Sequence, residues 1–143
     1  MNDYKLIGGF GYMAKATIGR CILGILALFF MGTGLVLMIS PSVMLAHTFI
    51  GPIDSVGGLS SIRSLWGGTT IAIWAIVLLG AIRSNVDHIM VGFIALMLVL
   101  VGRLVGYFID GSYPEFIPTV VPTIVAAVIM IIACKLMAHT ADV

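Results

Sequence analysis

Two arginines lie within otherwise apolar stretches and are the residues best placed to do chemistry. Arg63 lies near the start of the second apolar stretch, and Arg103 lies near the end of the third. A charged side chain in the hydrocarbon of a bilayer costs about 2.5–3.5 kcal/mol, so such residues face a bundle interior, water or a counter-charge. A guanidinium binds carboxylates and phosphates through paired hydrogen bonds. The two arginines are therefore a candidate site for an anionic headgroup, a quinone-like carbonyl or a small carboxylate.

Three acidic residues offer a structural interpretation of the same arginines. Asp54, Asp110 and Glu115 lie in the connections at the corresponding ends of the apolar stretches. The arginines then pair with Asp54 and Asp110, or extend their charged ends to lipid headgroups. Arginines near a membrane interface more often have this structural role, so ligand binding stands as the alternative hypothesis.

No motif for catalysis, cofactor binding or metal binding accompanies these charges. His47, His88 and His139, with the cysteines Cys21 and Cys134, show no metal-ligand spacing. No apolar stretch carries an acidic residue at mid-depth, which argues against cation-coupled transport. No nucleophile–base pair is visible either. We therefore predict that the protein is not an enzyme and that it uses no cofactor and no metal.

The composition predicts which elements hold these residues. Of 143 residues, 61% are hydrophobic and only 9% are charged, whereas a soluble domain carries about 25% charged residues. A helix that crosses a bilayer needs about 20 mostly apolar residues. Four stretches satisfy this length, at about 18–39, 59–82, 88–109 and 117–137.

The predicted fold is an all-α integral membrane four-helix bundle. Ser40-Pro41 ends the first helix because proline cannot continue helical hydrogen bonding, and Asp110-Gly111 ends the third. Short connections at 83–87 and 110–115 require antiparallel neighbours. The longer connection at 40–58 lies in the interface or packs over helix ends. The predicted organisation is an amino tail at 1–17, the four-helix domain at 18–139 and a carboxyl tail at 140–143.

The basic residues predict an orientation. One side of the predicted bundle carries Lys5, Lys15, Arg20, Arg83 and Lys135. Lysine and arginine are retained on the cytoplasmic side of membranes, so both termini are expected to be cytoplasmic in a multi-pass inner-membrane protein. The other side carries the acidic residues and a group of aromatic residues, namely Trp66, Tyr107, Tyr113 and Phe116. This orientation places Arg63 and Arg103 at similar depths in the outer leaflet.

Glycines accompany both arginines. Gly102 and Gly106 are spaced by one helical turn around Arg103, and Gly67-Gly68 follows Arg63. Small residues let helix backbones approach closely in membranes. We expect these glycines to form helix contacts within the bundle rather than a dimer interface.

The segment from Leu59 to Gly68 resembles a signature of small bacterial four-helix membrane proteins, the family of domain of unknown function 4345. The signature reads acid, hydrophobic, Arg, two residues, aromatic, Gly-Gly, and the arginine corresponds to Arg63. A Gly-Arg pair matches Gly102-Arg103, and a turn with proline matches Asp110-Gly111 and Pro114. The likeness extends from Ala14 to Lys135, and the layout is similar to that of DoxX-like proteins.

The resemblance implies a four-helix membrane fold but no activity. One position differs from the signature, since Ser61 stands where the family has its acid. If that acid is the partner of the signature arginine, Arg63 lacks it in this chain. Arg63 is then available to Asp54, Asp110, a lipid or another subunit.

Two functional hypotheses follow. The first is a non-catalytic accessory or scaffolding subunit of a membrane complex, or a homo-oligomer, with membrane lipids and other membrane subunits as its partners. The alternative is a binding or transport protein for an anionic or lipid-like ligand at an outer Arg63/Arg103 pocket. The net charge of +1 without a basic block predicts no nucleic-acid partner. The absence of a soluble domain and the glycine-rich helix faces favour the first hypothesis.

Overall fold

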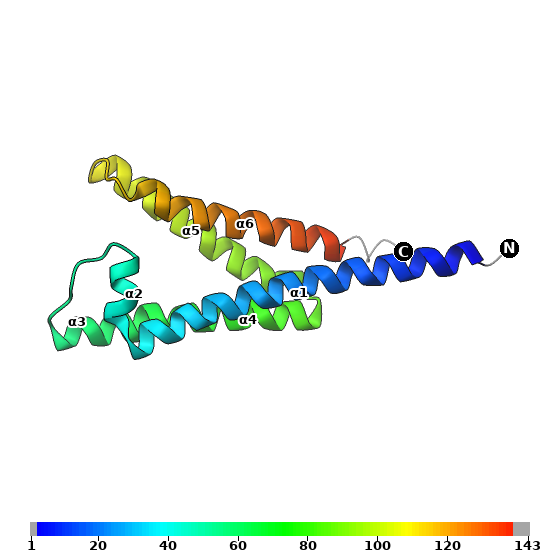
Figure 1. The fold of residues 1–143 in the computed structure, drawn as a ribbon, viewed down its shortest axis with the longest axis horizontal. Helices are drawn as coiled ribbons and strands as arrows, with labels where there is room; N and C mark the ends of the chain where they lie inside the picture. The colour runs from blue at the N-terminus through cyan, green and yellow to red at the C-terminus, as the bar shows by residue number, and fades with distance from the viewer. Residues whose placement is uncertain (1–2, 139–143) are drawn as a thin grey trace.

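The computed structural model describes residues 3–138, with side chains from Ala14 onward, and the regular secondary structure of this part of the chain consists of helices alone. The predicted carboxyl tail at 140–143 and His139 lie outside the described residues. The helices, in chain order (Figure 1), are α1 (Asp3–Ile39), α2 (Pro41–His47), α3 (Val56–Ser61), η1 (Ile62–Gly68), α4 (Thr69–Arg83), α5 (Val86–Ile109) and α6 (Phe116–Ala138). The segment η1 is a π-helix, and α3, η1 and α4 follow one another without a break.

Four helical segments are long and apolar enough to cross a bilayer. They are Ala14–Ile39, Val56–Arg83, Val86–Ile109 and Phe116–Ala138. Each exceeds the length of about 20 residues that a spanning helix needs. The predicted number of long apolar helices is therefore confirmed, and each predicted range lies within one of these segments. Four such helices suggest a multi-pass membrane protein. Helix α1 itself begins at Asp3, so it continues through residues that were predicted as an amino tail.

The four long segments form a closed ring. Helix α1 packs on α4, α4 on α5, α5 on α6, and α6 on α1. The described ends of the chain lie at the same end of the bundle as the α4–α5 turn, which we call the closed end (Figure 1). We call the other end the splayed end, because there α5 and α6 diverge from α1, α2, α3 and η1 (Figure 1).

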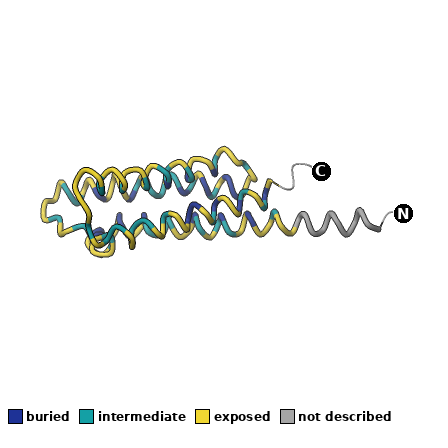
Figure 2. Tube along the Cα trace, turned by 90° about the horizontal axis from the view of Figure 1, so that it is seen from above, coloured by how far each residue is buried: buried dark blue, intermediate teal, exposed yellow. Residues whose placement is uncertain are grey.

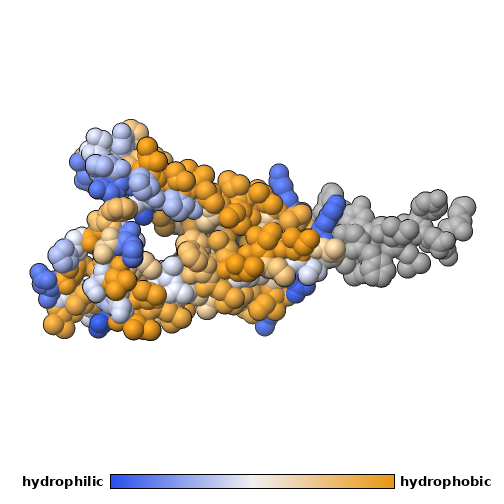
Figure 3. Space-filling model, in the orientation of Figure 1, coloured by the Kyte–Doolittle hydropathy of each residue, from blue (hydrophilic) through white to orange (hydrophobic). Residues whose placement is uncertain are grey.

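Close packing is concentrated towards the closed end. The larger core lies in this half of the bundle (Figure 2) and includes Leu23, Val77, Ile89 and Met130. Helices α1 and α6 approach so closely that a Cβ on Gly19 would lie 2.7 Å from the backbone oxygen of Ala133. The outward faces carry many exposed large apolar side chains, and these form most of the visible surface in Figure 3. Such a surface suits hydrocarbon rather than water.

An arginine of α1 binds the end of α4 in the same region. Arg20 donates from Nε to the carbonyl oxygen of Ala81 at 2.9 Å, and from Nη2 to that of Ile82. The last four carbonyls of a helix have no partner within the helix. A cation at a helix carboxyl end also interacts favourably with the helix dipole. Arg20 therefore ties α1 to the α4 terminus, a role that the sequence analysis did not assign to it.

The splayed end consists of two arms. In one arm, a small core of Leu37, Leu45 and Ile62 holds α2 against α1 and η1. The connection between the first two spans thus packs over helix ends, one of the two predicted arrangements. The other arm is formed by the ends of α5 and α6 and the turn that joins them. A hollow between the two arms is visible in Figure 3.

The π-helical segment lies within the first arm and contains Arg63. Ser61 and Ser64 donate their hydroxyls to the carbonyl oxygens of Gly57 and Ser60, at 3.0 and 2.9 Å. Such bonds compete with the regular helical ladder and bend helices. The following Gly67-Gly68 pair adds no side chain to stabilise an α-helical turn. The predicted span at 59–82 is therefore continuous, but it contains a π-helical segment, a feature that is frequent at functional sites.

Candidate functional site

The two arginines lie at the splayed end, but they line two separate cavities. Arg103 lines a cavity of about 690 Å³, and Arg63 lines a neighbouring cavity of about 570 Å³. Ile50, from the connection after α2, lines both cavities. The arginines share one end of the bundle, as the sequence indicates, yet the connection after α2 lies between them. The structure therefore provides two cavities with one arginine each in place of one shared pocket.

The Arg103 cavity lies between the two arms of the splayed end. One wall is the face of α5 that carries Val99, Gly102, Arg103, Gly106 and Asp110, which recur at the three- and four-residue spacing of a helix face. The opposite wall and the rim are formed by other elements, through Thr48, Ile50, Trp66 and Tyr113. Tyr113 is held in turn against Phe116 at the start of α6, with ring centroids 5.7 Å apart. The separation of the arms creates the cavity.

Gly102 and Gly106 line this cavity, and here the structure differs from the helix-packing expectation. A Cβ on Gly102 would meet no atom within 4 Å, and one on Gly106 would meet only Asp110 of the same helix, at 3.6 Å. The reason is the divergence of α5 from the other arm, which leaves no helix of the described chain in contact with these positions. Both glycines therefore give the cavity its width instead of bringing two helices together.

Gly67 and Gly68 behave differently from each other. A Cβ on Gly67 would lie 3.1 Å from the backbone oxygen of Gly34, and the reverse distance is also 3.1 Å. Gly67 thus lies at a backbone contact between η1 and α1. A Cβ on Gly68 would have nothing within 4 Å. The partner glycine, Gly34, was not among the predicted contact residues.

The guanidinium of Arg103 has a buried donor without an acceptor. Its Nε is inaccessible to solvent and has no hydrogen-bond partner, and among the described residues Arg103 forms no ion pair. The predicted pairing with Asp110 is therefore not formed, although both residues line the same cavity. A buried donor that lacks an acceptor costs about 1–3 kcal/mol. An oxyanion in the cavity would balance the positive charge of Arg103, which lines it.

The Arg63 cavity is different in character. Arg63 and Asp54 both line it and both are exposed, and neither forms an ion pair within the described part of the chain. Unlike Arg103, Arg63 has no buried side-chain nitrogen without a hydrogen-bond partner. The remaining predicted acid, Glu115, lines neither arginine's cavity. Glu115 lies directly before α6, and its backbone oxygen accepts a hydrogen bond from the Thr119 hydroxyl at 2.9 Å.

The family model for the domain of unknown function DUF4345 matches residues 18–137. The chain belongs to the DUF4345 family. No curated protein and no solved structure matches it. The family resemblance drawn from the Arg63 and Arg103 motifs is confirmed, since the matched region includes both arginines and all four spans. The description of DUF4345 names no activity.

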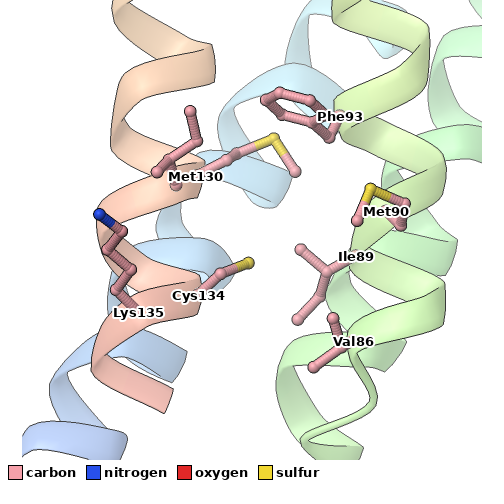
Figure 4. Close-up of a pocket in the computed structure, with 8 residues that line it drawn as sticks. Val86, Ile89, Met90, Phe93, Met130, Cys134 and Lys135 are labelled. Atoms are coloured by element: carbon pink, nitrogen blue, oxygen red, sulfur yellow. The ribbon is translucent and has the colours of Figure 1, made fainter. Parts of the chain in front are cut away.

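The DUF4345 protein has a further, smaller cavity between α5 and α6 near the closed end (Figure 4). Its volume is about 190 Å³, and its lining includes Ile89, Phe93 and Met130. The sulfur of Cys134 points into it, whereas the amine of Lys135 points away (Figure 4). The accessible lining is entirely apolar, so this cavity suits hydrocarbon and offers no polar group to orient a ligand. Among residues 3–138 no three histidine, cysteine or acidic side chains are placed to hold a metal ion.

Proposed function

We propose that this DUF4345 protein binds the anionic group of a membrane amphiphile in the Arg103 cavity. The observation that supports this function is that Arg103 lines the cavity and forms no ion pair with any described residue. A phosphate or carboxylate forms charge-assisted hydrogen bonds with a guanidinium, and these are about twice as strong as neutral ones. The proposed role is binding rather than catalysis.

The surroundings of Arg103 favour an amphiphile over a small hydrophilic anion. The cavity volume of about 690 Å³ falls within the range of about 300–1,000 Å³ that is typical of ligand sites. Val99 and Ile50 supply apolar lining beside the charge. The outward faces of both arms are apolar, so a membrane lipid is the ligand most abundant at the cavity.

We also propose that the splayed end faces the outer side of a bacterial inner membrane. Lys15, Arg20, Arg83 and Lys135 all lie towards the closed end. Basic residues are retained on the cytoplasmic side, so the closed end and both termini are assigned to the cytoplasm. The Arg103 cavity then opens in the outer leaflet.

The accessory-subunit or homo-oligomer hypothesis remains the competing function. It was favoured in part by Gly102 and Gly106 as helix contacts, and these glycines line the cavity instead. Because no helix of the described chain packs on them, these positions are open to a ligand or to a helix of another subunit.

Substitution of Arg103 tests the proposal. We expect native mass spectrometry after gentle detergent extraction to show a retained lipid-sized mass on the wild-type protein. Arg103→Gln should reduce its occupancy at least tenfold, which corresponds to about 1.4 kcal/mol. Arg63→Gln is the matched control, because it removes one guanidinium at the same end of the bundle from a different cavity. Equal retention in both variants would refute the proposal, and a larger mass with other polypeptides would favour the accessory subunit.

Filling the cavity provides an independent test. Gly102→Leu adds a side chain where a Cβ has free space, so the fold should tolerate it while the ligand is excluded. We expect unchanged detergent stability and loss of the retained mass. A variant that keeps its lipid would show that binding does not occur in this cavity.

A further inference from the structure

The Arg103 cavity contains a charge of the opposite sign. Asp110 lines it together with Arg103, and the two residues are seven positions apart, or two turns along the same face of the helix. The Asp110 carboxylate lies close to Gly106, since a Cβ on that glycine would be 3.6 Å from Oδ2. Within the described residues the carboxylate and the guanidinium do not pair. The cavity therefore offers two separate sites of opposite charge.

The order of the lining residues along α5 has a direction. At 1.5 Å per residue, Arg103 lies about 6 Å beyond Val99, and the α-carbon of Asp110 lies about 10 Å beyond that of Arg103. From the middle of the helix towards the splayed end, the lining is thus apolar, then cationic, then anionic. A phospholipid of the same leaflet presents an acyl chain, then a phosphate, then its headgroup amine in that order.

Two aromatic residues also line the cavity. Trp66 and Tyr113 line it from η1 and from the α5–α6 turn. Aromatic faces attract cations, including ligand ammonium groups. A cavity lined by a carboxylate and two aromatic residues is therefore a suitable environment for an ammonium group.

We propose that the ligand is a zwitterionic phospholipid whose phosphate binds Arg103 and whose ammonium binds Asp110. This inference rests on the proposed function and specifies its ligand. A primary ammonium donates charge-assisted hydrogen bonds to a carboxylate, whereas a quaternary ammonium has no N–H to donate. Phosphoethanolamine is therefore the best-matched headgroup. An anionic phospholipid satisfies Arg103 but leaves Asp110 without a cation.

Headgroup preference gives the test. Purified protein is titrated with phosphatidylethanolamine or phosphatidylglycerol of identical acyl chains in mixed micelles, and the bound lipid is counted by native mass spectrometry. The wild-type protein should favour phosphatidylethanolamine at least tenfold, and Asp110→Asn should reduce this preference to less than twofold. Glu115→Gln is the matched control, because it removes one negative charge close to the same turn but outside the cavity, and its preference should equal that of the wild type.

The outcomes separate the two proposals. If Arg103→Gln releases lipid while Asp110→Asn leaves the preference unchanged, the zwitterion is refuted and the anion site at Arg103 stands. If Arg103→Gln retains all its lipid, both proposals fail. Equal effects of Asp110→Asn and Glu115→Gln would reveal a general surface-charge effect and would refute the role of Asp110.

A soluble competitor identifies the source of the headgroup. Glycerophosphoethanolamine carries the same phosphate and ammonium but no acyl chains, so we expect it to displace little lipid at equal concentration. Displacement as effective as that by the intact lipid would overturn the assignment of a lipid and indicate a water-soluble phosphoamine ligand.

Discussion

Gly19→Ala is expected to destabilise the bundle by about 1–3 kcal/mol, the usual cost of inserting a group into a well-packed core. The added Cβ would lie 2.7 Å from the backbone oxygen of Ala133 and 3.0 Å from Cγ of Met137. A side chain moves aside by changing its rotamer, but a backbone carbonyl moves only with its helix. The substitution therefore forces α1 and α6 apart at the closed end. The free energy of unfolding in detergent measures the loss.

Gly32→Ala is the control for this prediction. Gly32 lies in the same helix, and a Cβ there would meet no atom within 4 Å. Alanine favours a helix over glycine by up to about 1 kcal/mol, so Gly32→Ala should leave the protein equally stable or more stable. Equal stability of the two variants would mean that α1 and α6 are not in close contact at Gly19.

Arg20→Gln is expected to lower the stability by about 2 kcal/mol. The variant loses hydrogen bonds from a charged donor to the carbonyl oxygens of Ala81 and Ile82, and bonds to charged groups contribute about 1.5–3 kcal/mol. It also removes the cation from the carboxyl end of α4. Thermal unfolding in detergent, followed by circular dichroism, measures the change.

Arg83→Gln separates this specific effect from the loss of a positive charge. Arg83 lies in the last turn of α4, is exposed and makes no side-chain hydrogen bond to the described residues. Both variants remove one positive charge from the same end of the bundle, but only Arg20→Gln should unfold at a lower temperature. A similar shift in both would assign the effect to positive charge near the α4 terminus instead of the Arg20 hydrogen bonds.

The spans were predictable because hydropathy is summed over whole helices. About 20 consecutive apolar residues have few alternatives to a spanning helix, so local ambiguity has little effect. Two helix ends were also predictable, because one or two residues are enough to end a helix. Helix α1 ends at Ile39, directly before Ser40-Pro41, and α5 ends at Ile109, directly before Asp110.

Contacts between distant residues were not predictable in the same way. The pairing of Gly34 with Gly67 depends on how α1 and η1 pack, and no local pattern encodes the partner of a glycine. The same holds for Arg20, whose acceptors lie 61 and 62 residues further along the chain. The π-helical segment depends on hydrogen bonds from serine hydroxyls, which compete with the backbone hydrogen bonds of a regular α-helix. A hydropathy profile does not register this competition.

The candidate site combines features that the sequence predicts with features that it does not. The depth of Arg63 and Arg103 follows from counting residues along two helices, and both arginines lie at the same end of the bundle. The two arginines line separate cavities because of the position of Ile50, which lines both. Ile50 belongs to the connection after α2, and the sequence does not determine the path of this connection. Gly102 and Gly106 are correctly recognised as small residues on one face, but that pattern is the same for a helix contact and for a cavity wall.

The divergence of the two arms gives the protein a wedge shape across the membrane (Figure 1). In the proposed orientation, the molecule occupies a larger cross-sectional area in the leaflet of the splayed end than in the leaflet of the closed end. A bilayer that bends towards the closed end relieves this difference in area, whereas a flat bilayer must compress its lipids around the wider half. Under the proposed function, occupancy of this opening by a lipid would therefore respond to the lateral pressure and curvature of the surrounding membrane.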